Sequence, residues 1–299
     1  MLGLDAMTPT SWRAPSGRNT TCHGTAANMF RPGDYRMLLC AEVSAEDFYV
    51  IHHEMGHIEY YMSYRDQPAI FQDGANSAFQ EAVGDAVMFG VLAPQHLLRL
   101  RLVDDDEAFS PDTQIALLLQ QALARLPQVP FGLLVDKWRW RALSGALRPP
   151  EYTAAWWALR SHYQGVSPPV PRAADDFDPA AKFHIPDNTP YVRYFLASFL
   201  QMQLFKAMCE AAVLGRVGPP ARLSLPLHQC DIYGSKDAGK RLRAMMEMGS
   251  SRPWPAALEA VAGERGYSAG PLLQYYAPLH DWLARQVWRH RIPVGWDRD

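Results

Sequence analysis

Apolar positions recur at the three- and four-residue spacing of amphipathic helices along most of this chain. The first strong pattern covers residues 45–66, with Ser44 placed to cap its start and Pro68 beyond its end. Each such stretch predicts one helix. The same spacing predicts further helices over residues 111–126, 132–145, 150–164, 190–214, 235–248, 254–262 and 270–290.

A second early helix is predicted from its start signal. Ser77 and Gln80 have the spacing of a capping box, and the apolar pattern behind them runs to about Val91, before Pro94. Proline lacks the amide hydrogen of the helical ladder, so we expect the helix to stop there. Strand signals are scarce, and only residues 34–42 favour a short strand. The predicted fold class is therefore mainly α, with at most a few short strands.

Three segments rich in proline, glycine or small polar residues are expected to be loops, namely residues 1–21, 165–188 and 215–226. Loops as long as the middle one are often functional. The sequence contains no internal repeat, so a repeat architecture is excluded.

Composition narrows the class of protein. The chain has 299 residues, of which 48% are apolar and 20% charged, as is typical of one or two folded domains. Its 29 basic residues are balanced by 31 acidic ones, which leaves no positive surplus for nucleic acid. There is no apolar run long enough for a membrane span, and residues 1–18 lack a signal-peptide pattern. We expect no nucleic-acid partner, and no signal peptide or membrane anchor in this chain.

Four cysteines bear on the compartment. Proximity in the sequence pairs Cys22 with Cys40 and Cys209 with Cys230, although four cysteines allow three connectivities. Such disulfides indicate an oxidising compartment, and the NTT sequon at residues 19–21 would fit a glycoprotein. The alternative is four buried, reduced thiols.

The sharpest local signal is the sequence HEMGH at residues 53–57, inside the first predicted helix. His53 and His57 are four residues apart, so both imidazoles lie on one helix face and can reach one metal ion. Glu54 lies beside them and is placed to act as a general base. The alternative is two surface histidines on a helix.

A third ligand is expected on the next helix. Glu81 follows His57 by 24 residues, and Asp85 lies one turn further along the same helix face. A carboxylate at Asp85 can hydrogen-bond the ring nitrogen of a ligating histidine and fix its tautomer. Taken alone, Glu81 is equally an acidic residue of a first helical turn, favoured by the helix dipole. Together these residues predict a catalytic zinc site, where zinc acidifies a bound water and polarises the scissile carbonyl.

The segment that begins at residue 52 (HHEMGHIEYYMSYRDQPAIFQDGANSAFQEAVGDAV) resembles the active-site segment of the angiotensin-converting enzyme family, the M2 zinc peptidyl-dipeptidases. The resemblance extends over residues 22–299, and residues 1–21 form an irregular segment outside it. It implies a helical zincin of the gluzincin type. Further similar segments are FGLLVDKWRWR (131–141), WWALRSHYQG (156–165), PPVPR (168–172), DFDPAAKFHIPDNTPYVRYF (176–195), CDIYGSKDAGKRL (230–242), SRPWPAALEAVAG (251–263) and PLHDWL (278–283).

The resemblance implies roles for residues around the metal. His53, His57 and Glu81 are the implied zinc ligands, and Glu54 is the implied base. The family releases dipeptides from the C-termini of small peptides, so it implies peptide substrates. KFHIP and YVRYF resemble the dipeptidase branch more closely than the branch that removes one residue.

The resemblance also implies residues that hold the substrate. Tyr194 resembles the tyrosine that stabilises the oxyanion, and His184 and His23 resemble two histidines that hold the substrate backbone. Lys182 and Tyr191 resemble the pair that binds the C-terminal carboxylate of the peptide. A charged group that holds this carboxylate at a fixed distance from zinc would place the peptide bond two residues from the C-terminus at the metal.

Chloride, an activator in the family, is implied as a second ligand. Arg193 resembles the arginine of one chloride site, and Trp156 and Arg160 resemble parts of another. Without the resemblance, both arginines are ordinary ion-pair partners and Trp156 is a packing residue. In the same way, Lys182 is a solvated loop lysine, and His184 and Tyr194 are loop and core residues.

The sequence also departs from the family. The family's catalytic domain is about twice this long, so the chain corresponds to its C-terminal half, and the N-terminal half would be a missing partner. Residues 215–225 form an apparent insert, Gln128 stands where an aromatic residue is usual, and Gly24 replaces an alanine. These changes put in question which substrate side chains are accepted, but not the zinc chemistry.

Two functions follow from the sequence. The first is an active zinc peptidyl-dipeptidase of the secretory pathway or the extracellular space, as the family and the cysteines indicate. The alternative is a truncated isoform or paralogue that binds zinc or a partner with little or no turnover. The intact HEMGH favours the first, and the missing half favours the second.

Overall fold

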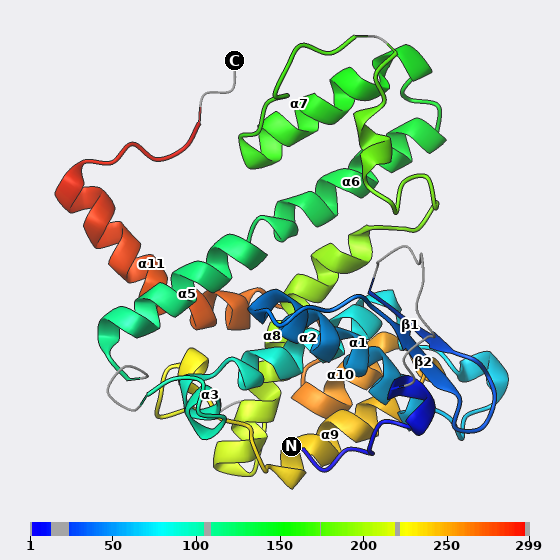
Figure 1. The fold of residues 1–299 in the computed structure, drawn as a ribbon, viewed down its shortest axis with the longest axis vertical. Helices are drawn as coiled ribbons and strands as arrows, with labels where there is room; N and C mark the ends of the chain where they lie inside the picture. The colour runs from blue at the N-terminus through cyan, green and yellow to red at the C-terminus, as the bar shows by residue number, and fades with distance from the viewer. Residues whose placement is uncertain (1, 13–23, 105–108, 174, 219–221, 297–299) are drawn as a thin grey trace. The chain divides into compact units, whose positions relative to one another are not determined.

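A computed structural model describes residues 2–12, 24–104, 109–173, 175–218 and 222–296 of the protein. The chain divides into two compact units, one of residues 1–114 and 199–275 and the other of residues 115–198 and 276–299. In chain order the elements, with η for a 3-10 helix, are η1 (Pro9–Trp12), β1 (Thr25–Asn28), β2 (Tyr35–Leu38), α1 (Ala45–Ser63), η2 (Ala69–Phe71), α2 (Ser77–Val91), α3 (Pro94–Arg99), α5 (Pro111–Arg125), α6 (Gln128–Leu143), η3 (Pro149–Glu151), α7 (Tyr152–Gln164), η4 (Asp178–Ala181), α8 (Val192–Leu214), η5 (Leu227–Gln229), α9 (Lys236–Met246), α10 (Trp254–Ala262) and α11 (Gly270–His290) (Figure 1).

The fold is mainly α, as predicted, because the described residues contain only two short strands. Helix α1 begins as expected, with the Ser44 side chain accepting a hydrogen bond from the Asp47 amide at 3.0 Å. The described residues contain no helix with both the length and the apolar content needed to cross a bilayer.

The start of α2 differs from the prediction by one residue. Asn76, not Ser77, is the N-cap, and its side-chain oxygen accepts from the amides of Ala78 and Phe79. Both residue types are good N-caps, but here Asn76 has the extended backbone that a cap requires. The predicted end of α2 is confirmed, since the helix ends at Val91, and Pro94 begins the next helix, α3. Proline suits that position because a first-turn amide has no helical partner.

The strand prediction is also corrected. The expected strand over residues 34–42 is limited to β2, which pairs antiparallel with β1 from Thr25↔Leu38 to Asn28↔Tyr35. β1 was not predicted because its sequence, TAAN, has little β-propensity. The hairpin packs on α1, where Tyr35 joins a buried cluster with Ile58 and Met62.

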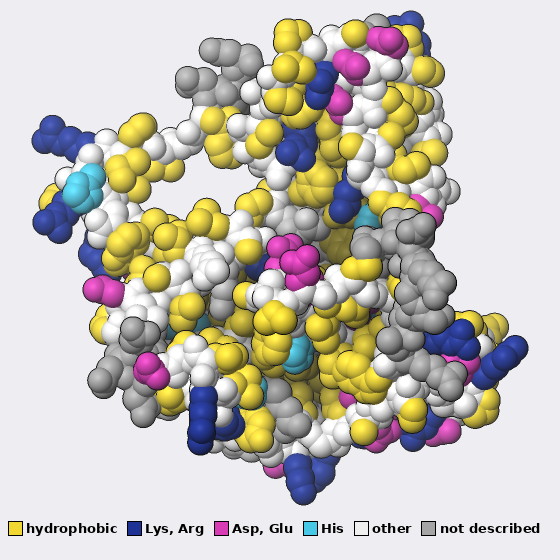
Figure 2. Space-filling view, viewed as in Figure 1, with side chains coloured by type: hydrophobic (Ala, Val, Ile, Leu, Met, Phe, Trp, Pro, Cys, Tyr) yellow, Lys and Arg dark blue, Asp and Glu magenta, His cyan; other side chains and the backbone are white. Residues whose placement is uncertain are grey.

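The core of the first unit lies among α1, α2, α9, α10 and the later part of α8 (Figure 1). Phe89 on α2 packs against Phe205 and Tyr275, with ring centroids 5.8 and 5.1 Å apart. Ile58 and Tyr60 of α1 and Phe79 and Ala82 of α2 are fully buried, so an apolar core holds both helices. Hydrophobic side chains also gather at the surface over the region of α1 and α2 (Figure 2).

The second unit is built around α6 and α7. Leu134, Val135, Trp138, Trp156 and Tyr191 form its buried cluster. The indole of Trp138 donates to a backbone carbonyl at 2.9 Å, so its polar edge is satisfied within the core. Helix α6 begins four residues before its predicted start, because a proline in the first turn breaks no helical hydrogen bond.

Candidate functional site

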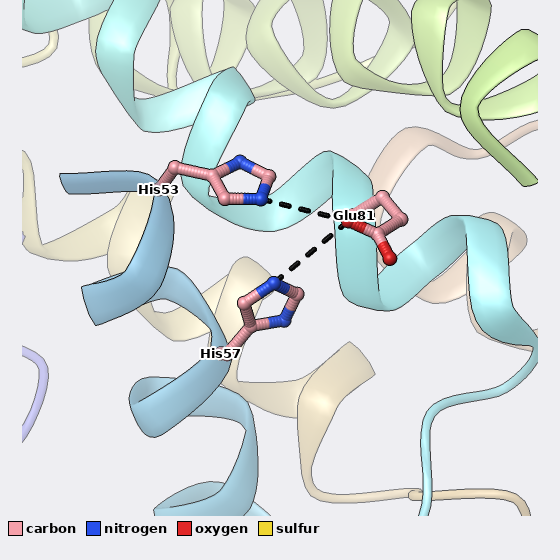
Figure 3. A group of neighbouring side chains, drawn as sticks. All are labelled: His53, His57 and Glu81. Carbon is pink, nitrogen blue, oxygen red and sulfur yellow. Dashed lines mark ion pairs between the residues drawn. The ribbon is translucent and has the colours of Figure 1, made fainter. Parts of the chain in front are cut away.

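The three predicted metal ligands converge in the first unit. His53 and His57 lie on one face of α1, and Glu81 reaches them from the first half of α2 (Figure 3). The Glu81 Oε2 atom is 3.5 Å from His53 Nε2 and 3.8 Å from His57 Nε2. One ligand atom from each residue lies within 4.8 Å of the other two. The cluster therefore surrounds a point that one ion can reach.

Close helix packing makes this cluster possible. A Cβ on Gly56 would lie 2.3 Å from the Gly84 Cα atom, and a Cβ on Gly84 would lie 2.5 Å from the His53 carbonyl oxygen. No other residue fits at such distances. The glycine in HEMGH thus lets α1 cross α2 closely enough for Glu81 to reach the two histidines.

The expected partner of the first histidine is in place. The Asp85 Oδ1 atom lies 2.7 Å from His53 Nδ1, and the Tyr49 hydroxyl also donates to this carboxylate. Nδ1 therefore carries a proton, and Nε2 faces Glu81. Burial opposes the charged form of His53, but the carboxylates of Asp85 and Glu81 outweigh it and raise the pKa of His53 well above its ordinary value. Burial lowers the pKa of His57 to about 4, so that imidazole is neutral, the form that binds metals.

The donor set fits zinc. Two imidazole nitrogens and one carboxylate oxygen are typical of catalytic zinc sites, which keep a further position for water. Ligands about 2.0 Å from one ion at tetrahedral angles are roughly 3.3 Å apart, close to the separations between Glu81 and the two histidines. His53, His57 and Glu81 could thus hold zinc with small movements of their side chains.

The predicted base, Glu54, lies on α1 beside the cluster and is only 5% exposed. Its Oε2 atom is buried and has no hydrogen-bond partner among the described residues. Burial raises the pKa of Glu54 to about 7, with the charge of Glu81 adding to the rise and that of His53 opposing it. A Cβ on Gly24 would lie 2.9 Å from Glu54 Oε1, so the missing side chain there leaves room for this carboxylate.

The second unit gathers four more of the predicted residues. His184 Nε2 lies 3.0 Å from the Tyr194 hydroxyl, and the rings of Tyr191 and Tyr194 are 4.6 Å apart. The Lys182 ammonium lies 5.2 Å from the centroid of the Tyr191 ring. Gln128, flagged as a departure from the family, donates to the Tyr191 hydroxyl at 3.1 Å. The implied oxyanion and carboxylate residues are therefore neighbours.

A buried aspartate that the sequence analysis missed holds this group in place. Asp136 is fully buried and accepts hydrogen bonds from the amides of Tyr191 and Val192 and from Arg139, at 2.7 to 2.8 Å. Arg139 also donates to both oxygens of Asn188. The sequence did contain a signal for it. Asp136 ends the apolar run FGLLVD, and an acid buried with such a run needs a hydrogen-bond or ion-pair partner.

Comparison with known proteins agrees with this geometry. A sequence profile of peptidase family M2, described as angiotensin-converting enzyme, matches residues 1–296. The chain belongs to the angiotensin-converting enzyme family. The match includes residues 1–21, which the sequence analysis leaves outside the resemblance.

Individual relatives of the family show how much of the protein this chain represents. Angiotensin-converting enzyme of Bos taurus is 43% identical over 99% of this chain and 22% of its own length. The enzyme of Theromyzon tessulatum is 42% identical over 94% of the chain and 45% of its own length. Angiotensin-converting enzyme-like protein Ace3 of Mus musculus is 41% identical over 99% of the chain and 40% of its own length. The chain thus spans less than half the length of these relatives.

The residues that resemble the family's chloride sites lie in different environments. Trp156 is buried in the core of the second unit. Arg160 lies over the ring of Phe131 at 5.1 Å, and its buried Nε atom has no partner among the described residues. Burial lowers the pKa of Arg160. Arg193 donates from Nε to the Pro190 carbonyl oxygen at 2.9 Å.

The cysteine predictions are partly tested. Cys209 and Cys230 form a disulfide, which confirms that pair. Cys22 lies outside the described residues, so its pairing with Cys40 stays a prediction. His23 also lies outside them, and its role stays a prediction.

Proposed function

We propose that this chain carries the hydrolytic centre of a zinc peptidyl-dipeptidase, which releases dipeptides from the C-termini of oligopeptides. The observation that carries the proposal is the convergence of His53, His57 and Glu81 beside a buried glutamate. Membership of the angiotensin-converting enzyme family supports it. When bound, zinc would polarise the scissile carbonyl and acidify a water molecule.

Glu54 acts as the general base in this proposal. Its carboxylate takes a proton from the attacking water and returns it to the leaving amine. The partnerless Oε2 atom supports this role, because a buried acceptor with no partner in the protein is available to a water molecule. The Asp85 contact keeps His53 oriented with its Nε2 lone pair toward the metal.

The second unit supplies substrate contacts. The Tyr194 hydroxyl is the donor that stabilises the tetrahedral oxyanion, and His184 holds its orientation through their hydrogen bond. Lys182 and Tyr191 bind the peptide's C-terminal carboxylate, an ammonium and a hydroxyl being suited to that charge. His23 and His184 contact the peptide backbone.

Chloride is proposed as an activator. The buried Nε of Arg160 has no partner among the described residues and lies one turn of α7 from Trp156, which supports an anion at that place, and Arg193 is assigned to a second site. We also infer that the protein folds in the secretory pathway, because the Cys209–Cys230 disulfide is typical of oxidising compartments.

Hydrolysis of an N-blocked tripeptide tests the proposal. Release of the C-terminal dipeptide should stop with a chelator, return with zinc, and rise with chloride. Glu54→Gln should abolish release while zinc still binds at one ion per chain. Glu46→Gln is the matched control, because Glu46 is an exposed residue of the first turn of the same helix. Dipeptide release by Glu54→Gln at the unchanged rate would contradict the role of Glu54.

A second candidate function is zinc binding without turnover. It is favoured by the share of its relatives that the chain spans, because groups carried elsewhere in those proteins would then be needed for hydrolysis. Zinc bound at one ion per chain with no dipeptide release would support it. Adding the part of the Theromyzon tessulatum enzyme that this chain does not match would then show whether the two pieces together release dipeptide.

A further inference from the structure

The first unit contains a cavity of about 520 Å³ on the reverse side of α1 and α2. Its floor includes Met55 from α1 and Val83 and Val87 from α2. Residues 52, 56 and 59 of α1 share this side of the helix, whereas the predicted metal ligands at 53 and 57 share the other. The cavity is therefore separate from the metal centre.

A fixed N-terminal segment forms the roof. Leu4 and Met7 line the cavity from above, together with Trp12. The Asp5 carboxylate in this segment accepts from Arg65 at 2.8 Å and from Arg243 at 3.0 Å. Leu2 is buried, and its carbonyl oxygen lies where a Cβ on Gly239 would be. These anchors keep the segment above the helices, so the space is part of the fold.

The walls combine a large apolar surface with a few hydrogen-bond acceptors. His52 donates from Nδ1 to the Phe48 carbonyl at 2.7 Å, which leaves Nε2 as an acceptor. The carboxylate of Glu59 lines the cavity and forms no hydrogen bond with the described residues. Burial raises the pKa of Glu59 to about 7, with the charge of Asp5 adding to the rise and that of Arg243 opposing it. The carboxylate of Asp5 is held by its two arginines. The ionised Glu59 carboxylate is therefore the cavity group that lacks a donor among the described residues.

We propose that this cavity is a binding site for a small amphiphilic amine, whose apolar body fills the space and whose ammonium donates to Glu59. The volume lies within the range of small-molecule sites, which are mostly apolar with a few placed polar groups. An ammonium offers three hydrogen-bond donors and a charge opposite to that of the Glu59 carboxylate, whereas a ligand with its own carboxylate would be repelled by Glu59. This site does not depend on the proposed peptidase function.

Calorimetric titration of the zinc-loaded chain with n-octylammonium, n-octanoate and n-octanol tests the proposal. We expect n-octylammonium to bind at least about tenfold more tightly than n-octanoate, the factor expected for one charged hydrogen bond. Glu59→Gln should lower the n-octylammonium affinity roughly tenfold and leave n-octanol unchanged. Glu46→Gln removes the same charge from the exposed start of α1 and should change neither affinity.

Methionine methyl resonances locate the ligand. With ¹³C-labelled methionine, n-octylammonium should shift the methyl signals of Met7 and Met55, which line the cavity. The signals of Met208 and Met246, fully buried elsewhere, should stay in place. Ala6→Trp, on the extended roof segment, should weaken all three probes by narrowing the space.

Three results would overturn the proposal. The first is equal affinity for n-octylammonium and n-octanoate. The second is an n-octylammonium affinity that Glu59→Gln leaves unchanged in a variant with the native circular dichroism spectrum. The third is a shift of the control methyl signals without a shift at Met7 and Met55. Each of these would place the amine elsewhere or leave Glu59 without a role.

Discussion

The metal centre and the segment of residues 182–194 hold their side chains by opposite means. At the metal centre, α1 and α2 cross at a pair of glycines, and regular helices place every ligand. Residues 182–191 lie almost entirely outside long helices, and hydrogen bonds to Asp136 fix their end. Helix geometry places the side chains of the metal centre, and one buried acidic group fixes the backbone that carries the side chains of residues 182–194.

This difference predicts where each region is vulnerable. The helix crossing tolerates polar changes at its surface but no added atom at its centre, because two backbones touch there. The loop tolerates changes in its exposed side chains but not the loss of the acceptor to which its backbone is bound. Loss of a buried acceptor and crowding of a helix crossing should therefore show different patterns of lost stability and lost zinc affinity.

Asp136→Ala should be the most damaging change. It leaves the buried Arg139 without its carboxylate partner and removes the acceptor of two amides, Tyr191 and Val192. Breaking a buried pair in this way costs about 3–5 kcal/mol in the free energy of unfolding. Urea unfolding should show that loss, while zinc affinity stays within about twofold, because the metal ligands belong to the other unit.

The exposed Asp187, in the same segment, provides the control. Asp187→Ala removes a carboxylate that bonds only to Thr189 among the described residues, and it should cost less than about 1 kcal/mol. Equal losses for the two variants would mean that burial of Asp136 is not what fixes the segment.

Gly56→Ala should break the other region. The added methyl group would lie 2.3 Å from the Gly84 Cα atom, so α1 and α2 must move apart. Overpacking of this kind typically costs about 1–3 kcal/mol, and the shift should also lower zinc affinity by separating Glu81 from the histidines. Urea unfolding and zinc titration measure the two effects.

Gly266→Ala serves as the matched control, because a Cβ there has no atom within 4 Å. It should leave both unfolding and zinc binding unchanged. A Gly56→Ala variant that binds zinc with native affinity would show that the helices can part without moving the ligands.

The contrast between local helix geometry and long-range hydrogen bonds also explains which features of the fold and the site could be predicted from the sequence. The histidine pair His53 and His57 was visible because helical spacing converts sequence distance into position on a face. Glu81, on the next helix, was instead expected from its place after the motif and from the family resemblance. The disulfide between Cys209 and Cys230 was likewise visible from its spacing. Local, periodic features were therefore predicted well.

The features that were missed depend on contacts far apart in the sequence or on competing local signals. Asp136 bonds to amides 55 and 56 residues away, and no periodic pattern reports such a pair. The segment that covers the cavity, residues 2–12, is irregular up to the 3-10 helix η1 and has no periodic pattern of its own. Asn76 and Ser77 are both good caps, so spacing alone chose the wrong one.

Asp85→Asn should have a moderate effect confined to the metal centre. An amide can place its oxygen at His53 Nδ1 but has no charge to strengthen that contact. Loss of such a partner typically lowers metal affinity about 10- to 100-fold, and unfolding without metal should change by less than about 1 kcal/mol. Competition with a chromogenic chelator measures the affinity.

Two further variants show whether the charge of Asp85 or its hydrogen bond from Tyr49 positions His53. Tyr49→Phe removes the other donor to Asp85 but keeps the carboxylate, so it should lower zinc affinity less than Asp85→Asn. Asp66→Asn changes an exposed carboxylate of the same unit and should have no effect. A larger loss in Tyr49→Phe than in Asp85→Asn would mean that the hydroxyl, not the charge, positions His53.

The smallest effect is expected at Asp5, the exposed counterpart of Asp136. Both are aspartates that hold a non-helical segment through arginine, but the Asp5 side chain is 37% exposed. Hydrogen bonds from Arg65 and Arg243 lower its pKa below the ordinary value of 3.8. Because the folded-state pKa is the lower one, the stabilisation is complete above the unfolded pKa and is lost as the pH falls through the folded pKa.

At pH 6, Asp5→Asn should therefore lower the free energy of unfolding by about 1 kcal/mol or less, since exposed pairs contribute little. The difference in unfolding free energy between the wild-type protein and the variant should shrink toward pH 3, and also in high salt, where exposed charges are screened. A loss of the same size at pH 3, or one as large as that of Asp136→Ala, would show that burial does not set the strength of these two anchors.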